Sequence, residues 1–199
     1  MDLSSPRISF DDRLLAVEES FRQRQYQAGS VELSRLEEQE FRESPPEMGL
    51  YLLLQADRLF FEGGYKEAIE SGLRSARILA DFPHNRRYAR VQLILSKAYY
   101  ALGEMKNAEI RARDALAAYR RANDDEGQVD ALNQLAGIAY LRCDYAAAAA
   151  FLEDALEMVG SDGRKLAQLT GNLGRTRART GQWDQAELDL KSAIERNST

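Results

Sequence analysis

The strongest constraint on the fold is an internal repeat. Four segments, EGGYKEA, LGEMKNA, RCDYAAA and TGQWDQA, end at Ala68, Ala108, Ala148 and Ala186, so successive copies are 40, 40 and 38 residues apart. Each segment follows an amphipathic stretch of about four helical turns and precedes another one. A repeat of this length with a bend in its middle is typical of stacked helical hairpins. The sequence therefore predicts an all-α chain built from antiparallel pairs of helices.

Small residues after each bend indicate how the two helices of a hairpin meet. Alanine ends all four segments, and a small residue recurs seven positions later, at Ser75, Ala115, Ala155 and Ala193. Two antiparallel helices can approach closely just beyond their connection only where the side chain between them is small. In the first helices of the pairs, we expect the equivalent residues Leu95, Leu135 and Leu173 to point inward.

Composition favours helices and excludes several classes of function. Ala, Leu, Glu, Arg and Gln are abundant, Val and Thr are scarce, and we expect no β-strand. With 32 acidic against 27 basic residues, the net charge of −5 gives no whole-chain reason to expect binding to nucleic acid or to an anionic membrane. The N-terminus does not resemble a secretion signal, and no stretch approaches the roughly 18 apolar residues of a membrane span. We therefore expect a cytoplasmic protein.

The repeated positions resemble the tetratricopeptide repeat family. That family places Leu-Gly in the first helix, an aromatic residue at the turn and alanine at two set positions in the second helix. The best matches in this chain are Leu173-Gly174, Trp183, Ala186 and Ala193. Because the period of 40 residues exceeds the usual 34, the resemblance is to the long-period variant of kinesin light chains and bacterial peptide-pheromone receptors. It implies a right-handed superhelical solenoid of about five hairpins that binds a protein or peptide partner in a concave groove.

We expect the domain organisation to follow the repeat. Residues 1–9 form a flexible N-terminus, and residues 10–45 form a divergent first hairpin that caps the stack. Four clear hairpins then occupy residues 46–82, 86–122, 126–159 and 163–197.

Two ends of this organisation carry further expectations. In the first hairpin, the helices 10–24 and 29–43 are joined near residues 26–29, and Ser44-Pro45-Pro46 ends the second of them because proline cannot continue a helix. At the other end, the last helix carries Leu188, Leu190 and Ile194 with no capping element after it. This pattern predicts either a longer polypeptide or packing against a second copy, as a possible homodimer.

Residue patterns for catalysis or metal binding are not evident. His84 is the single histidine and lies in a loop without a second histidine or a cysteine to complete a catalytic pair or a metal site. Cys143 is the single cysteine and replaces the glycine of the other bends, which indicates a structural role. We therefore expect no enzyme, no cofactor and no metal.

Two polar segments are best explained as helix ends. The acidic run Asp124-Asp125-Glu126 lacks the alternating oxygen ligands of a calcium loop and instead suits the N-cap of a helix. In GSDGRK, Gly160 ends one helix, and Ser161 or Asp162 caps the next.

The resemblance assigns the partner-binding positions to the first helix of each hairpin. The first clear hairpin contributes Leu50, Leu53, Asp57 and Phe60, and the second contributes Arg90, Leu93, Ile94, Lys97 and Tyr100. The third and fourth contribute Asn133, Gln134, Gly137 and Tyr140, followed by Gln168, Asn172, Arg175 and Arg179. The early positions are thus apolar, and the late ones are rich in amides and basic groups.

These positions imply a mode of binding. Gln134 and Asn172 match the asparagine with which the resembled peptide receptors grip a ligand backbone, because an amide can donate to a peptide carbonyl and accept from its N–H. Arg175 and Arg179, with help from Arg90 and Lys97, would bind a carboxylate. The candidate partner-binding residues are Arg90, Lys97, Tyr100, Asn133, Gln134, Tyr140, Asn172, Arg175 and Arg179.

The sequence thus predicts a binding module for a peptide with an acidic end. The resemblance implies that this module is the sensory or scaffold region of a bacterial signalling or regulatory protein. A structural assembly factor that homo-oligomerises through its last helix is the alternative. Nucleic-acid binding through the basic late positions is a weaker third interpretation, given the acidic total charge.

Overall fold

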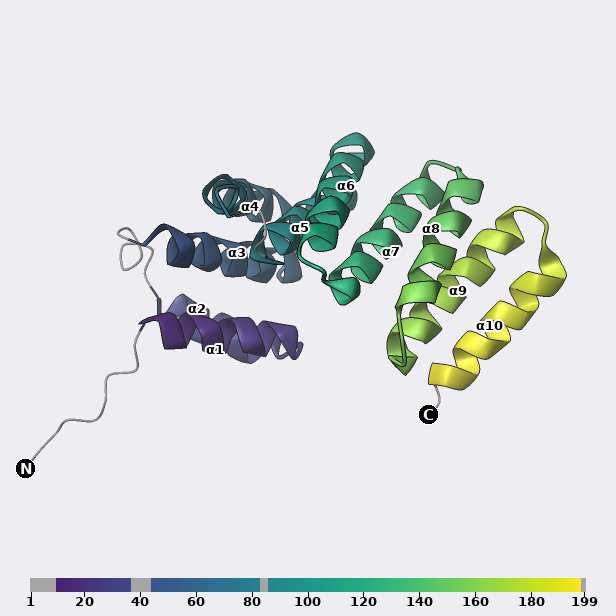
Figure 1. Ribbon diagram of the computed structural model, residues 1–199, viewed down its shortest axis with the longest axis horizontal. Helices are drawn as coiled ribbons and strands as arrows, with labels where there is room; N and C mark the ends of the chain where they lie inside the picture. Colours follow the sequence, from purple (N-terminus) through teal and green to yellow (C-terminus); the bar gives the residue numbers. More distant parts are fainter. Residues whose placement is uncertain (1–9, 37–43, 83–85, 198–199) are drawn as a thin grey trace, which may run out of the picture. The chain divides into compact units, whose positions relative to one another are not determined.

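The computed structural model describes residues 10–36, 44–82 and 86–197, and these ranges contain ten helices (Figure 1). They are α1 (Phe10–Arg22), α2 (Tyr26–Ser34), α3 (Pro45–Phe61), α4 (Tyr65–Leu79), α5 (Arg86–Ala101), α6 (Met105–Arg121), α7 (Asp125–Leu141), α8 (Tyr145–Met158), α9 (Gly163–Arg179) and α10 (Trp183–Asn197). The same ranges contain no β-strand. The predicted all-α class and the hairpin architecture are confirmed. The predicted flexible segment 1–9 and the predicted loop residue His84 lie outside the described residues.

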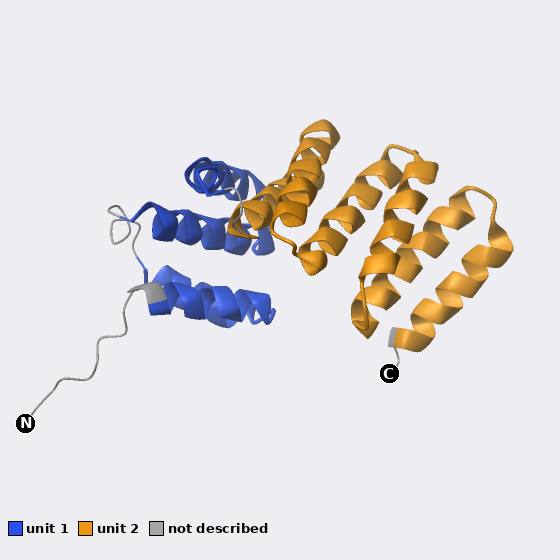
Figure 2. Cartoon of the chain, in the orientation of Figure 1, with its two compact units in different colours: residues 1–83 blue, residues 84–199 orange. Residues whose placement is uncertain are grey.

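The chain divides into two compact units, residues 1–83 and 84–199 (Figure 2). In the first unit, α1 packs against α2, α3 packs against α4, and both α1 and α2 contact α3. In the second unit, three hairpins follow one another: α5 with α6, α7 with α8 and α9 with α10. Contacts of α6 with α7 and of α8 with α9 join neighbouring hairpins, and α5 also contacts α7.

None of the described helices has both the length and the apolar character needed to cross a bilayer.

The repeat alanines are buried where the two helices of each hairpin meet. Ala68, Ala108 and Ala148 have 0% of their surface exposed, and Ala186 has 3%. The small residues seven positions later, Ser75, Ala115 and Ala155, are also fully buried, and Ala193 is half-buried. Leu95, Leu135 and Leu173 are buried as predicted. The sequence pattern therefore identifies the seam along which each hairpin closes.

Each bend within the repeated hairpins has one residue in the left-handed region of backbone conformation. Gly63 has φ 86°, Gly103 and Gly181 have φ 79°, and Cys143 has φ 61° at the equivalent place. Glycine adopts this conformation freely, whereas a residue with a Cβ does so at a cost of about 1–2 kcal/mol. Cys143 thus performs the turn role of the glycine that it replaces, as predicted.

The first hairpin differs from its prediction in two respects. Its bend lies at residues 23–25 rather than 26–29, and α2 ends at Ser34. The predicted helix over 29–43 is therefore wrong in its start and at residues 35–36, and residues 37–43 lie outside the described residues. Gly29 lies inside α2, where an added Cβ would be 2.4 Å from Cε1 of Phe21. This glycine allows close packing instead of a turn. Pro45 begins α3, a position that suits proline because the first helical N–H has no partner within the helix.

Gly127 offers a direct test of hairpin packing. In the first turn of α7, an added Cβ would lie 2.2 Å from Cδ1 of the buried Tyr119 of α6. We expect Gly127→Ala to lower the free energy of unfolding by about 1–3 kcal/mol, because the Tyr119 ring has to move. Urea unfolding followed by circular dichroism measures the change.

Gly163, at the start of α9, is the matched control because nothing lies within 4 Å of its added Cβ. Gly163→Ala should leave stability unchanged or raise it by up to about 1 kcal/mol. Equal stability of the two variants would contradict the packing argument.

Candidate partner-binding surface

In the second unit, side chains of α7 and α9 meet at three regularly spaced places. Glu126 meets Lys165, Asn133 meets Asn172, and Tyr140 meets Arg179, and the two partners are 39 residues apart in every case. Along each helix the steps are seven residues, from 126 to 133 to 140 and from 165 to 172 to 179. Seven residues are close to two helical turns, so each set lies on one face of its helix. We call these three contacts the polar ladder.

The first rung of the ladder is ionic. The ammonium nitrogen of Lys165 is 3.0 Å from Oε1 of Glu126 and 3.1 Å from Oδ1 of Asp130. Its side chain is only 11% exposed. Burial lowers the pKa of Lys165, but the two carboxylates outweigh this effect and raise the pKa above its ordinary value. Lys165 is therefore charged and links α9 to α7.

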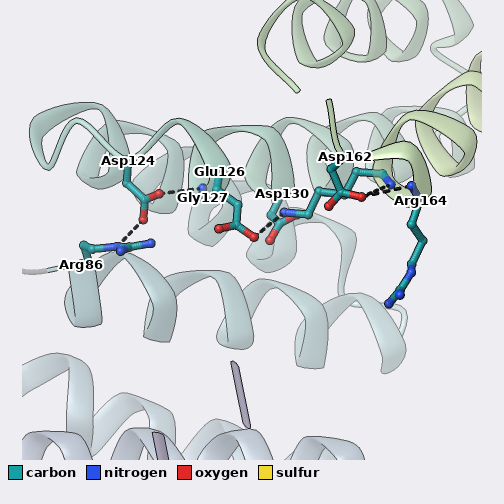
Figure 3. A network of polar contacts seen from close by, with 8 residues as sticks. Arg86, Asp124, Glu126, Gly127, Asp130, Asp162 and Arg164 are labelled. Carbon is teal, nitrogen blue, oxygen red and sulfur yellow. Dashed lines mark hydrogen bonds and ion pairs between the residues drawn. The ribbon is translucent and has the colours of Figure 1, made fainter. Parts of the chain in front are cut away.

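Helix caps hold the first rung in place (Figure 3). Asp124 caps α7 by accepting from the backbone N–H of Gly127 at 3.1 Å, and it also accepts from Nε of Arg86 at 2.6 Å. Asp162 caps α9 by accepting from the N–H groups of Arg164 and Lys165, at 3.0 and 3.1 Å. The predicted capping roles are confirmed, and Asp162 rather than Ser161 is the cap of α9.

The second rung is a directed chain of hydrogen bonds. A guanidinium N–H of Arg175 donates to Oδ1 of Asn172, and Nδ2 of Asn172 donates to Oδ1 of Asn133 at 2.8 Å. Both asparagines are half-buried. Gln134 lies beside Asn133, and its Nε2 is buried and makes no hydrogen bond in the described part of the chain. The structure thus links Asn172 to Asn133, the neighbour of the residue that we matched with it in sequence.

The third rung combines a hydrogen bond with an aromatic contact. Nε of Arg179 donates to the hydroxyl of Tyr140 at 3.1 Å, and its guanidinium carbon is 5.9 Å from the centroid of the Tyr140 ring. That ring packs edge-on against Tyr145, with centroids 5.4 Å apart. The hydrogen bond to Tyr140 raises the pKa of Arg179 further above its already high value. Arg179 is therefore charged and held in one place.

Arg175 and Arg179 have no carboxylate partner among the described residues. Arg177, between them in sequence, donates to Asp189 at 2.7 Å and to Glu153 at 2.8 Å. Arg175 and Arg179 are exposed and bond only to the neutral oxygens of Asn172 and Tyr140. Like charges four residues apart on a helix repel each other. The C-terminal half of the α9 face is therefore positively charged and not neutralised by the described chain.

The predicted residues of α5 lie next to this surface but are not part of the ladder. Arg90, Lys97 and Tyr100 are half-buried on α5, which contacts α7. A Cβ added to Gly137 of α7 would lie 3.8 Å from the Tyr100 hydroxyl, so these two helices meet at that glycine. The structure thus brings together six of the nine predicted residues on α7 and α9, with the other three on the neighbouring helix.

Four of the five predicted apolar positions of the binding surface are wrong, and the fifth, Phe60, is half-buried. Leu50 and Leu53 of α3 are 2% and 0% exposed, and Leu93 and Ile94 of α5 are 4% and 5% exposed. Each pair lies on the side of its helix that packs into the interior of its unit, so its side chains cannot meet a ligand. A period of seven residues alone does not separate this interior face from the adjacent exposed one.

Sequence reasoning missed Glu126, Asp130 and Lys165. We interpreted Glu126 only as part of a helix start, and Asp130 and Lys165 received no role. The sequence contained a signal for the Glu126–Lys165 pair, because these oppositely charged residues have the same separation of 39 residues as Asn133 and Asn172.

A hollow of about 580 Å³ lies in the first unit, and none of the nine candidate partner-binding residues lines it. It is lined in part by Tyr26 and Phe61, whose rings stack with centroids 4.5 Å apart. Its lining is mostly apolar, with Arg24 and two glutamines as its polar members.

Comparisons with known proteins agree with this architecture. Residues 127–198 match the sequence model of the tetratricopeptide repeat. A comparison with curated protein sequences found no match.

Solved structures are similar over nearly the whole chain. BtubC from P. vanneervenii has a TM-score of 0.76 and 20% identity, covering 94% of this chain and 79% of that one. A putative kinesin light chain from Podosopora anserina with nearly identical tetratricopeptide-like repeats has a TM-score of 0.70 and 16% identity, covering 94% of both chains. NprR in complex with its cognate peptide NprX has a TM-score of 0.76 and 17% identity, covering 97% of this chain and 58% of that one. At these identities, the likeness shows a shared fold.

The first rung gives a prediction that separates ionic from packing effects. Lys165→Met keeps the apolar stem and removes the ammonium, so we expect unfolding to become easier by about 1 kcal/mol at neutral pH. Folding raises the pKa of Lys165. Its contribution to the free energy of unfolding is therefore present at pH values below the pKa of the unfolded chain, and it is lost as the pH rises through the pKa of the folded protein. Denaturant unfolding from pH 7 to above pH 11 measures the difference between the two proteins.

Asp130→Asn and the double variant complete the cycle for this rung. Coupling between the two substitutions should be positive at low salt and shrink at high salt. Purely additive effects would show that the rung contributes packing alone.

Proposed function

We propose that this chain, whose residues 127–198 belong to the tetratricopeptide repeat family, is a module that binds a peptide segment of a partner protein on the α7–α9 face. The observation that carries the proposal is the pair of exposed guanidinium groups, Arg175 and Arg179, held by neutral oxygens. The structure of NprR with its cognate peptide supports the proposal, because it has this fold and holds a peptide.

Charge balance in the second unit argues for an acidic ligand. Lys165, Arg177 and Arg86 are each matched by carboxylates of the chain itself. Arg175 and Arg179 repel each other and have no such match among the described residues, so a ligand carboxylate would remove the repulsion and form charge-assisted hydrogen bonds. Asn133 and Asn172, one rung away, would bind the backbone of the same peptide through their side-chain amides. An extended or helical segment with an acidic end fits this arrangement.

The finer role remains the prediction made from the sequence. We propose a non-catalytic interaction region of a bacterial signalling or regulatory protein, without a cofactor and located in the cytoplasm.

A second candidate function, self-assembly through α10, is favoured by a separate observation. Trp183 and Ile194 are each 67% exposed, and Leu188 is 61% exposed. Self-assembly predicts a mass that rises with concentration in light scattering, whereas the binding module needs only a monomer.

A library selection tests the binding module. Immobilised wild-type chain is offered a pool of random octapeptides, and bound peptides are identified by mass spectrometry. We expect enrichment of peptides with Asp or Glu near one end. Arg175→Glu with Arg179→Glu should abolish that enrichment, because the double variant reverses the charge of the site.

Arg120→Glu with Arg121→Glu is the matched control, since both residues are exposed in the last turn of α6. This variant has the same change of net charge and should retain the acidic preference. Wild-type selection without an acidic preference, or the same selection by both double variants, would refute the proposal.

A further inference from the structure

The hollow of the first unit lies where the start of α2 meets the last residue of α3. Its volume of about 580 Å³ falls in the range of roughly 300–1,000 Å³ that is typical of ligand sites. Two residues of the bend between α1 and α2, four residues of α2 and one of α3 line it: Arg24, Gln25, Tyr26, Gln27, Ala28, Val31 and Phe61. The hollow is thus made entirely by the first unit and shares no residue with the polar ladder.

One wall of the hollow is apolar and is left uncovered by the described chain. The rings of Tyr26 and Phe61 stack nearly parallel, at an interplanar angle of 14°. Phe61 is nevertheless 60% exposed, and Val31 is 48% exposed. Single exposed apolar side chains are common on protein surfaces, but here two of them line one concavity together with a half-buried aromatic ring. Such a wall is suited to covering an apolar side chain of a partner.

Arg24 occupies a backbone position that belongs to glycine at three of the four later hairpin bends. Its φ is 61°, in the left-handed region, like those of Gly63, Gly103 and Gly181. Glycine adopts this conformation freely, whereas a residue with a Cβ adopts it only at a cost. A residue that is kept at a strained position in spite of this cost indicates a role other than stability.

The charge of Arg24 is not used within the described part of the chain, where its side chain has no hydrogen bond and no ion pair. In contrast, the neighbouring arginines Arg22 and Arg35 pair with Glu19 and Glu32. Arg24 is also the single charged residue of the lining. It can therefore form a charge-assisted hydrogen bond with one carboxylate of a ligand, whereas a nucleic acid would require a row of cations for its phosphates.

The open form of the hollow favours a protein segment over a small molecule. Sites for small molecules bury most of the ligand surface, and the exposure of Phe61 and Val31 shows that this hollow does not enclose its contents. A polypeptide can place one side chain in the hollow while the rest of the segment lies on the surface.

We propose that the hollow binds a segment of a partner protein that carries a large apolar side chain beside an aspartate or glutamate. The apolar side chain packs against Tyr26, Val31 and Phe61, and the carboxylate accepts a hydrogen bond from Arg24. This site is separate from the α7–α9 face, so it stands or falls independently of the proposed function.

A selection on a chain without the two α9 cations tests the proposal. The variant with Arg175→Glu and Arg179→Glu is immobilised and offered random octapeptides whose two ends are blocked, so that the end groups carry no charge. We expect enrichment of peptides in which a large apolar residue lies within two positions of Asp or Glu, wherever the pair occurs in the peptide. No enrichment, or enrichment of apolar residues without a nearby acid, would overturn the proposal.

Substitutions in the same chain then measure the contribution of each part of the hollow to the Kd of the most tightly bound octapeptide. Arg24→Gln removes the charge and should raise Kd at least about fivefold, and Phe61→Ala removes the exposed ring and should raise Kd at least about tenfold. Arg22→Gln is the matched control, because it makes the same change at an exposed residue outside the lining. Its Kd should stay within about twofold. An unchanged Kd in Arg24→Gln, or an equal loss in Arg22→Gln, would overturn the proposal.

Arg24→Gly separates binding from folding. Because glycine adopts the left-handed conformation freely, we expect this variant to unfold at the same or a higher urea concentration and to bind the octapeptide as weakly as Arg24→Gln. A clearly lower unfolding midpoint would assign Arg24 a structural role and overturn the proposal. A mass that rises with concentration in light scattering, and no longer does so in Phe61→Ala, would assign the hollow to a second copy of the chain and would also overturn it.

Discussion

Close approach of paired helices at the repeat alanines is the constraint on which the rest of the structure depends. Because Ala68, Ala108 and Ala148 leave no exposed surface, the two helices of each hairpin meet just beyond their bend. In the second unit, α8 packs against both α7 and α9, and the first helices α7 and α9 meet at a constant separation of 39 residues on every rung.

The polar ladder shows how a regular scaffold becomes specific. Its first rung is a closed ionic contact, with Lys165 matched by two carboxylates and fixed by the capped ends of α7 and α9. Its third rung is open, since Arg179 bonds to a tyrosine and retains its positive charge at the surface. Asn133 and Asn172 form the step between them. A surface with an excess carboxylate at its first rung and cationic groups at its third suits a ligand whose acidic end lies over the third rung.

Much of this fold, but less of its surface, could be predicted from the sequence. Ala108 and Leu95 predict a buried helix–helix contact, because small and apolar residues at fixed spacing are typical of such contacts. Asp124 and Asp162 predict helix starts, because an aspartate side chain can accept from the free N–H groups of the first turn. The bend predicted near Gly29 is wrong because a glycine that permits close packing and a glycine that permits a turn look the same in the sequence. Leu50 and Leu93 were wrongly assigned to the binding surface because the interior face and the exposed face of a helix are only one residue apart in sequence. The pairing of Asn172 with Asn133, and not with Gln134, depends on the rotation of α9 against α7, which repeat alignment does not define.

The most direct test of the central claim is a nuclear magnetic resonance titration of the full chain with an acidic octapeptide, following backbone amides and the side-chain amides of Asn133, Gln134 and Asn172. The account predicts that the largest shifts occur in residues 125–141 and 163–179 and include those side-chain amides. Shifts concentrated in α6 and α8, or in the first unit, with the three side-chain amides unmoved, would contradict it.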